Sequence, residues 1–134
     1  NNSLCDGTGD FPDYIRVDNA GNVNMGVHVS TSALPSTQYT SPSSGSRALA
    51  VAADNSTGTE GCDAGDMALD ANAAGGFENF TGIGGADEKT LCSNIDYTDG
   101  QDNIDVYARM YLAPDATGSA SFTWTFTAIP AVDN

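Results

Sequence analysis

Two stretches near the end of the chain, residues 103–112 and 119–128, alternate strictly between apolar and polar side chains. Alternation of this length, rich in aromatic and β-branched types, predicts a β-strand with one buried face. The residues between the two stretches include Pro, Asp and Gly, which favour a turn. We therefore predict a closing hairpin over residues 103–128. A lone hairpin cannot bury its apolar face, so the rest of the chain has to supply an opposing layer.

Shorter patterns of the same kind predict the remaining strands. Residues 14–18 and 23–30 flank a turn rich in Asn and Gly, which predicts a second hairpin. Residues 47–53 fit a strand better than a short buried helix, and residues 88–95 predict a central strand. No apolar pattern of helical period persists, so we predict one all-β domain over residues 1–134, an antiparallel β-sandwich of six or seven strands.

Long polar segments connect these strands. Residues 1–13 are rich in Gly and polar types and predict an extended lead-in. Residues 30–46 are mostly Ser and Thr with Pro, which predicts a long surface loop that packs no core and can carry O-linked sugars. Gly- and Asp-rich residues at 54–66 and 70–87 predict two further loops.

The charge balance of the chain excludes several classes of partner. The chain has 18 Asp and Glu against 4 Lys and Arg, which gives a formal net charge of −14. Nucleic acid and anionic membrane surfaces both require a basic patch, so we expect neither as a partner. No apolar run is long enough to cross a bilayer, so we expect no membrane insertion. The start at Asn1 and the near absence of Lys are typical of a processed, secreted protein.

The cysteine count predicts one disulfide and one further thiol. Three cysteines are present, at positions 5, 62 and 92. Because an extracellular β domain forms disulfides, we favour the pair Cys62–Cys92 and expect Cys5 to be unpaired or to form an intermolecular bond. The sequence leaves the other two pairings open. The spacing matches no zinc motif.

The sequence shows no catalytic constellation. The one histidine, His28, falls on the polar face of a predicted strand, whereas a Ser-His-Asp site needs its histidine in a cleft. Carboxylate pairs arise by chance in so acidic a chain, and no aromatic-lined cleft accompanies them. We therefore expect no enzymatic activity.

Three acidic runs could supply oxygen ligands to calcium. In the first, Asp6, Thr8 and Asp10 have the one-apart oxygen spacing of calcium loops. The second run contains Asp96, Asp99, Asp102 and Asp105, and the third contains Asp54, Glu60, Asp63 and Asp66. Calcium takes six to eight oxygen ligands from loops of this kind. No run matches a full ligand template, so a solvated acidic loop stays the alternative. Calcium is thus a possible ligand, and no cofactor is required.

Three N-x-S/T sequons predict glycosylation. Their asparagines are Asn1, Asn55 and Asn79, and none is followed by proline. All three fall in predicted loops, where a transferase could reach them.

The strand at 119–128 has two different faces. Phe122, Trp124 and Phe126 share one face, which predicts core packing, and Ser and Thr occupy the other. Edge strands are usually guarded by Lys or Pro. Because Lys89 is the one lysine in the chain, the outer strand is poorly defended and could pair with another chain by β-augmentation.

Two segments resemble a family of surface domains. The turn V-D-N-A-G-N-V at 17–23, within residues 14–30, resembles a hairpin of Ig-like β-sandwich domains in prokaryotic surface proteins. The segment 105–128, with P-D-A-T-G before an alternating strand, resembles their closing hairpin. Members of this family include S-layer modules, adhesins and subunits of extracellular filaments. The resemblance implies that this chain folds into an Ig-like sandwich of about seven strands. Residues 1–13 lack the alternating apolar positions of an N-terminal donor strand, so the C-terminal strand is the better candidate for contact.

These features together predict a structural role outside the cell. We expect a self-associating subunit of an extracellular filament or surface layer, a homo-oligomer built through β-strand contacts and decorated with covalent glycans. The alternative is a calcium-dependent adhesin or carbohydrate-binding module that uses the acidic loops.

Overall fold

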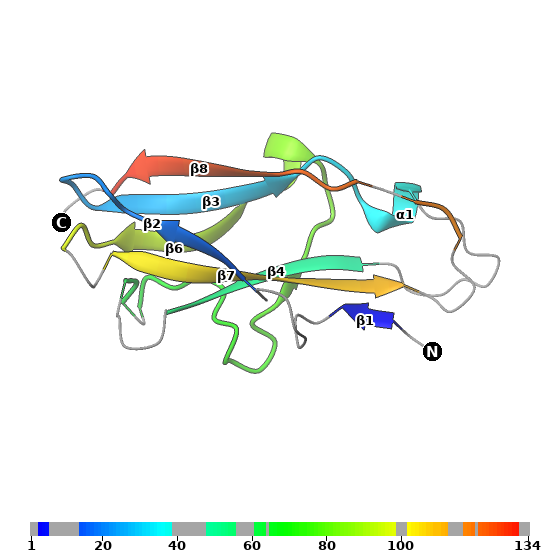
Figure 1. Ribbon diagram of the computed structural model, residues 1–134, viewed down its shortest axis with the longest axis horizontal. Coiled ribbons are helices and arrows are strands. Elements are labelled where there is room, and N and C mark those ends of the chain that lie inside the picture. The colour runs from blue at the N-terminus through cyan, green and yellow to red at the C-terminus, as the bar shows by residue number, and fades with distance from the viewer. Residues whose placement is uncertain are drawn as a thin grey trace.

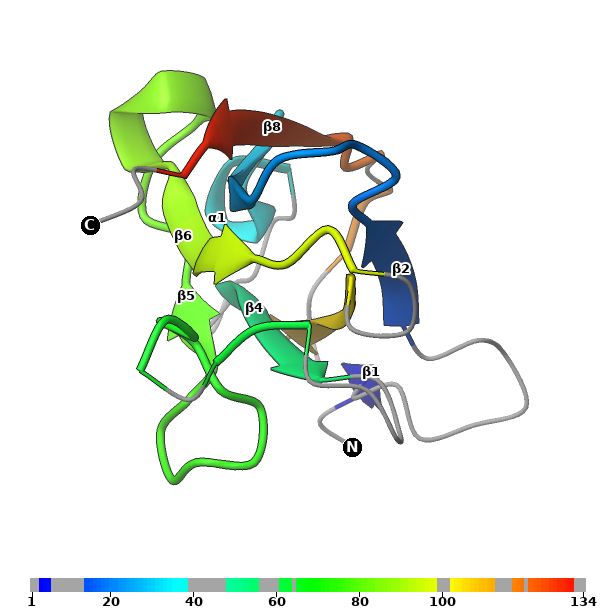
Figure 2. The same cartoon turned by 90° about the vertical axis from the view of Figure 1, so that its left-hand side faces the viewer.

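The chain folds into two facing β-sheets with long connections between them (Figures 1 and 2). The computed structural model describes residues 3–5, 14–38, 48–55, 61–63, 65–98, 102–112, 117–119 and 121–131. Its elements in chain order are β1 (Ser3–Cys5), β2 (Tyr14–Asp18), β3 (Met25–Thr31), the short helix α1 (Pro35–Gln38), β4 (Ala48–Asn55), β5 (Glu78–Asn79), the 3-10 turn η1 (Gly84–Asp87), β6 (Lys89–Ile95), β7 (Asn103–Leu112) and β8 (Trp124–Pro130).

All pairs of neighbouring strands are antiparallel. One sheet has five strands in the order β1-β7-β4-β5, with β2 also on β7, and the other has three in the order β6-β3-β8. β1 and β2 lie end to end along one edge of β7, because β1 pairs with its last residues and β2 with residues 103–107. The predicted all-β antiparallel sandwich is confirmed.

The order of the strands differs from that of an immunoglobulin domain at the two ends of the chain and at β5, which lies beside β4 and not beside β6. Such a domain has the orders A-B-E-D and C-F-G. If β1 and β2 count as the first strand, β3–β6 and β4–β7 correspond to its B–E and C–F pairs. The terminal strands have exchanged sheets, because β1 and β2 lie on β7 while β8 lies on β3. The C-terminal strand therefore forms an edge of the smaller sheet.

The predicted closing hairpin over 103–128 is wrong. Both strands form, but β7 belongs to the five-stranded sheet and β8 pairs with β3 in the other. Alternation identifies the side chains that share a face, and it contains no information on which backbone lies alongside. The segment after Leu112 is long enough to cross between the sheets, so the two amphipathic strands lie in opposite layers.

The predicted hairpin of residues 14–18 and 23–30 is wrong for the same reason. β2 pairs with β7, and β3 lies between β6 and β8 in the other sheet. Asn19 fixes the crossing between them. This buried side chain donates from Nδ2 to the carbonyl oxygens of Val23, Ile95 and Asp96 at 2.9, 3.2 and 3.1 Å. The predicted turn is thus a crossing between the sheets, which the one buried side chain of Asn19 holds in place while residues 20–23 are exposed.

Residues 88–95 form β6 as predicted, but at the edge of its sheet, and β3 is central. The outer side of β6 is not left open, because the backbone of residues 61–63 and 65–68 runs beside it. Ser93 N donates to the Asp66 carbonyl at 2.9 Å, and Ala68 N donates to the Leu91 carbonyl at 3.2 Å. A connecting loop therefore covers this edge.

Part of the predicted surface loop at 30–46 packs inside the molecule. Its first two residues end β3, residues 35–38 form α1, and Thr31, Ala33 and Pro35 are buried. Residues 39–46 lie outside the described residues, as do residues 6–13 of the predicted lead-in. A Ser/Thr-rich composition did not prevent burial here, because Thr31 Oγ1 donates to the Ala33 carbonyl at 3.1 Å.

The core lies between the two sheets and contains a disulfide. Its fully buried members include Val27, Val29, Leu91 and Ile95 from one sheet, and Val51, Ile104 and Val106 from the other. Cys62 and Cys92, both 0% exposed, are bonded to each other in this cluster. The predicted pair is confirmed, and Cys5, in β1, lies outside it. The bridge ties the loop at 61–63 to β6.

We expect the double substitution Cys62→Ala and Cys92→Ala to lower the free energy of unfolding by about 3–4 kcal/mol. The bridge joins residues with a sequence separation of 30 and restricts the unfolded chain accordingly. Unfolding in guanidinium chloride, followed by the fluorescence of Trp124, measures this loss. Cys5→Ala, which leaves the bridge intact, is the matched control. Equal midpoints for the double variant and this control would contradict the assignment.

Candidate functional site

The last strand, β8, forms one long edge of the molecule (Figure 1). Among the described strands it pairs with β3 alone, in the register His28↔Thr127, Val29↔Phe126 and Ser30↔Thr125. The other side of β8 is therefore a sheet edge without a described neighbour.

The backbone hydrogen bonds at the two ends of β8 show which of its residues face this edge. Ser32 N donates to the Thr123 carbonyl and Ala131 N to the Asn24 carbonyl, both at 2.9 Å. Peptide groups alternate in direction along a strand, so the odd-numbered residues face β3. The N–H and C=O groups of Trp124, Phe126 and Ala128 consequently point to the outer edge. Pro130 also faces outward, where its missing N–H costs no ladder bond.

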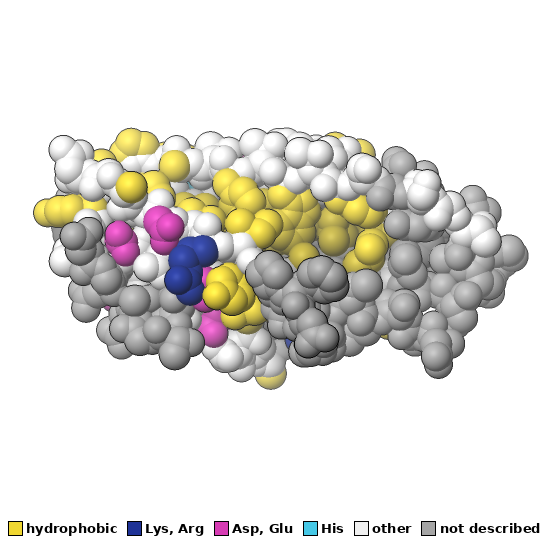
Figure 3. Space-filling model, in the orientation of Figure 1, with side chains coloured by type: hydrophobic (Ala, Val, Ile, Leu, Met, Phe, Trp, Pro, Cys, Tyr) yellow, Lys and Arg dark blue, Asp and Glu magenta, His cyan; other side chains and the backbone are white. Residues whose placement is uncertain are grey.

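The aromatic side chains of this region line the open side of the core. Phe122, Trp124 and Phe126 are half-buried and pack against the core cluster, as predicted. Trp124 contacts Phe80 with ring centroids 5.7 Å apart, and Phe126 with centroids 6.4 Å apart. In Figure 3 apolar side chains gather in a band beneath the edge that β8 forms. The core is thus only partly covered on this side.

An apolar groove adjoins the C-terminal end of β8. It has a volume of about 360 Å³ and lies between residues 18–21 and 23 of the crossing segment, which joins β2 to β3, and residues 128–130 of β8. Val23 and Ile129 are 56% and 44% exposed beside it. The crossing segment therefore leaves open space next to the end of this strand.

The β8 edge is uncharged, unlike the edge strands β2 and β5. Residues 117–131 contain no Asp, Glu, Lys or Arg, in a chain of net charge −14. β2 carries Arg16 and Asp18, and β5 carries Glu78.

Arg16 is bound to the buried Asp105 through two contacts, Nε–Oδ1 at 2.9 Å and Nη2–Oδ2 at 3.3 Å. Asp105 thus stabilises the β2–β7 pair rather than joining the acidic loop before it.

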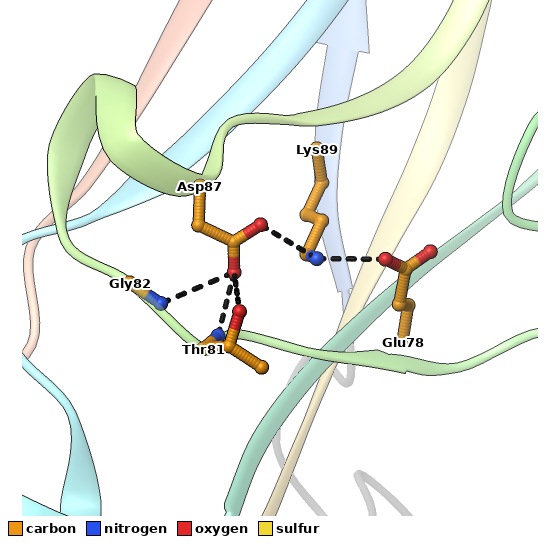
Figure 4. A network of polar contacts seen from close by, with 5 residues as sticks. All are labelled: Glu78, Thr81, Gly82, Asp87 and Lys89. Carbon is orange, nitrogen blue, oxygen red and sulfur yellow. Dashed lines mark hydrogen bonds and ion pairs between the residues drawn. The ribbon is translucent and has the colours of Figure 1, made fainter.

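The chain's one lysine is buried in a polar network (Figure 4). Lys89 Nζ lies 2.7 Å from Glu78 Oε1 and 2.7 Å from Asp87 Oδ1. Asp87 Oδ2 accepts hydrogen bonds from Thr81 N at 2.5 Å, Thr81 Oγ1 at 3.1 Å and Gly82 N at 3.3 Å. The network connects β5, η1 and the start of β6. Lys89 is therefore not positioned to guard an edge.

The charges in this network hold each other in the ionised state. Burial alone would raise the pKa of Asp87, but hydrogen bonds from Lys89 and Thr81 outweigh it and lower that pKa to about 2. Burial opposes the charge on Lys89 as well, yet its bonds to Asp87 and Glu78 raise its pKa above the ordinary value. A protonated amine is not a nucleophile. The arrangement acts as a structural clamp.

His28 lies on β3 and is half-buried. Its Nδ1 atom lies 3.2 Å from Thr90 Oγ1 and 3.5 Å from Glu88 Oε1. These partners come from the neighbouring strand β6 and the residue before it. Sequence alternation placed His28 on a polar face, and its partners across the strand pair are polar.

The two sequon asparagines that the structure describes differ in their access to a modifying enzyme. Asn55 is the last residue of β4, where its Nδ2 donates to the Cys62 carbonyl and its Oδ1 accepts from Cys62 N, both at 2.9 Å. Both ends of that amide are therefore occupied. Asn79 lies exposed in β5, two residues before Thr81. Asn1 lies outside the described residues.

Asp96 and Asp102, two of the predicted calcium ligands that the structure describes, accept hydrogen bonds from residues close to them in the chain. Asp96 Oδ1 accepts hydrogen bonds from Thr98 N at 3.1 Å, Tyr97 N at 2.6 Å and Thr98 Oγ1 at 3.1 Å, which lower its pKa. Asp102 Oδ1 accepts from Asn103 Nδ2 at 3.2 Å. Asp6, Asp10 and Asp99 lie outside the described residues. Within the described ranges no group of three or more His, Cys, Asp or Glu is placed to hold a metal ion.

Comparison with known proteins gives no relative from which a role could be transferred. No family model matches the chain, and neither the curated proteins nor the solved structures yield a match. In the part of the chain that the structure describes, no helix has the length and apolar character needed to cross a membrane. The candidate site therefore rests on the geometry of β8 itself.

We expect Asp87→Asn to lower the free energy of unfolding by about 1.5 kcal/mol at pH 7, because it removes a charged partner from Lys89. A folded-state pKa of about 2, below the ordinary value of 3.8, means that this stabilisation is complete above about pH 4 and is lost as the pH falls through 2. Urea unfolding between pH 5 and pH 2 measures the difference from wild type, which should shrink with falling pH. The exposed carboxylate of Asp63 supplies the control, Asp63→Asn. A difference independent of pH would contradict the charge assignment.

Proposed function

We propose that this chain is a structural subunit of an extracellular filament or surface layer, which associates with itself through β-strand contacts and carries covalent glycans. The observation that supports this most strongly is the outer edge of β8. It directs the peptide groups of Trp124, Phe126 and Ala128 outward beside half-buried aromatic side chains. An edge of this kind is a template for another strand.

The features that usually protect such an edge, a lysine or a covering segment, lie in other parts of the chain. Lys89 is buried in its clamp, and the outer edge of β6 is covered by residues 61–63 and 65–68. On β8 the one guard is Pro130, at the very end of the strand. An unguarded, uncharged edge fits a protein whose role is to assemble.

The disulfide and the exposed sequon support a place outside the cell. The buried Cys62–Cys92 bond persists in an oxidising compartment. Asn79 is exposed on β5, in the sheet opposite that of β8.

Self-association is tested by negative-stain electron microscopy of the purified protein across a concentration series. We expect regular filaments or sheets at high concentration, whereas monodisperse globules at every concentration would count against the proposal. Analytical ultracentrifugation of the same samples gives the size of the smallest assembly.

Glycosylation is tested by the intact mass of protein purified from its natural source. We expect a mass above the 13.7 kDa of the bare chain and loss of the excess in Asn79→Gln. Asn55→Gln is the matched control and should keep the excess, because the Asn55 amide is bonded to Cys62 at both ends. A native mass equal to that of the bare chain would remove glycans from the proposal.

A further inference from the structure

The outer edge of β8 has one register in which it pairs fully with itself. The outward positions are Trp124, Phe126 and Ala128, spaced evenly about Phe126. In an antiparallel pair with a second copy, a two-fold axis at Phe126 sets Trp124 opposite Ala128 of that copy and Phe126 opposite its own counterpart. All three positions then exchange both N–H···O bonds, about six bonds in total. Shifting the axis by one residue leaves outward groups unpaired within β8 or places Pro130, which has no N–H, in the ladder.

Side-chain sizes fit the same register. On the face toward the core, the largest side chain, Trp124, lies beside the small Ala128 of the second copy, and the two Phe126 rings meet at the axis. On the opposite face Thr125 lies across from Thr127 of the second copy. Aromatic pairs and Thr–Thr pairs are favourable neighbours across antiparallel strands. The pairing also covers aromatic side chains that are half-buried in the single chain.

Charge restricts where two copies can meet. Each chain has a net charge of −14, so copies repel one another over most of their surface. Residues 117–131 bring no charge to a contact, whereas β2 and β5 would. The apolar groove beside Ala128–Pro130 leaves space at that end of the strand.

We propose that β8 pairs antiparallel with β8 of a second copy about a two-fold axis at Phe126, which joins two three-stranded sheets into one continuous sheet. The inference rests on the proposed self-association and specifies its contact. An isologous contact of this kind closes on two copies. The pair is then the building unit, and a filament or layer grows from it through a different surface.

The register is tested by disulfide trapping in a Cys5→Ser background. Thr125 and Thr127 face each other as a non-hydrogen-bonded pair in this register, with Cα atoms about 4.5 Å apart, which is within disulfide range. Mixing Thr125→Cys protein with Thr127→Cys protein and then oxidising should give covalent dimers in high yield. Each variant oxidised alone is the matched control and should give several-fold less. Equal yields from a single variant, or no dimer from the mixture, would overturn the register.

A second variant tests the contact by affinity. Ala128→Pro removes an outward N–H without touching the ladder to β3, so the folded chain keeps its own hydrogen bonds. The dimer loses about two bonds, and its dissociation constant in sedimentation equilibrium should rise about 30-fold. Ala128→Ser keeps the N–H and should stay close to wild type. Assembly of Ala128→Pro with wild-type affinity would overturn this contact and leave the proposed function standing, whereas a wild-type protein that is monomeric at every concentration would contradict both.

Discussion

Burial of apolar side chains between two sheets that share no strand is the constraint on which this structure depends. Each amphipathic strand hides its apolar face only because a strand of the opposite sheet lies across from it. The chain therefore has to cross between the layers repeatedly, and the crossings need fixed junctions. Asn19 supplies one such junction through three backbone carbonyls, and the Cys62–Cys92 bond supplies another inside the core.

The edges of the sheets follow from that arrangement. β6 is covered by the loop that the disulfide holds, and β2 is bound to β7 through Arg16 and Asp105. The Lys89 clamp fixes the short strand β5 near η1 and β6. β8 has none of these covers. Because its residues carry no charge, it is also the part of this acidic molecule that a second copy approaches at least electrostatic cost.

The sequence predicted the positions of most strands and their buried faces, because alternation is a local property. It failed on which strands pair: residues 103–112 and 124–130 form strands in different sheets. A turn-like composition is compatible with a hairpin and with a crossing between layers, and local chemistry does not distinguish them. Asn19 shows the difference, since its partners Ile95 and Asp96 are far away in the chain.

The candidate site was predictable in part. The aromatic and Ser/Thr faces of the last strand and the scarcity of lysine could be read from the sequence. The burial of Lys89 could not, because its carboxylate partner Glu78 reaches it from a separate strand. The occupied amide of Asn55 depends likewise on Cys62, which only the fold brings beside it.

Amide hydrogen exchange along β8 tests the account most directly, because it reports each N–H separately. In dilute protein we predict alternation: slow exchange at Thr125 and Thr127, which face β3, and fast exchange at Trp124, Phe126 and Ala128. On assembly the second set should become protected as well. Equal protection of both sets in the monomer, or fast exchange of the second set in the assembled protein, would contradict the claim that β8 is the contact edge.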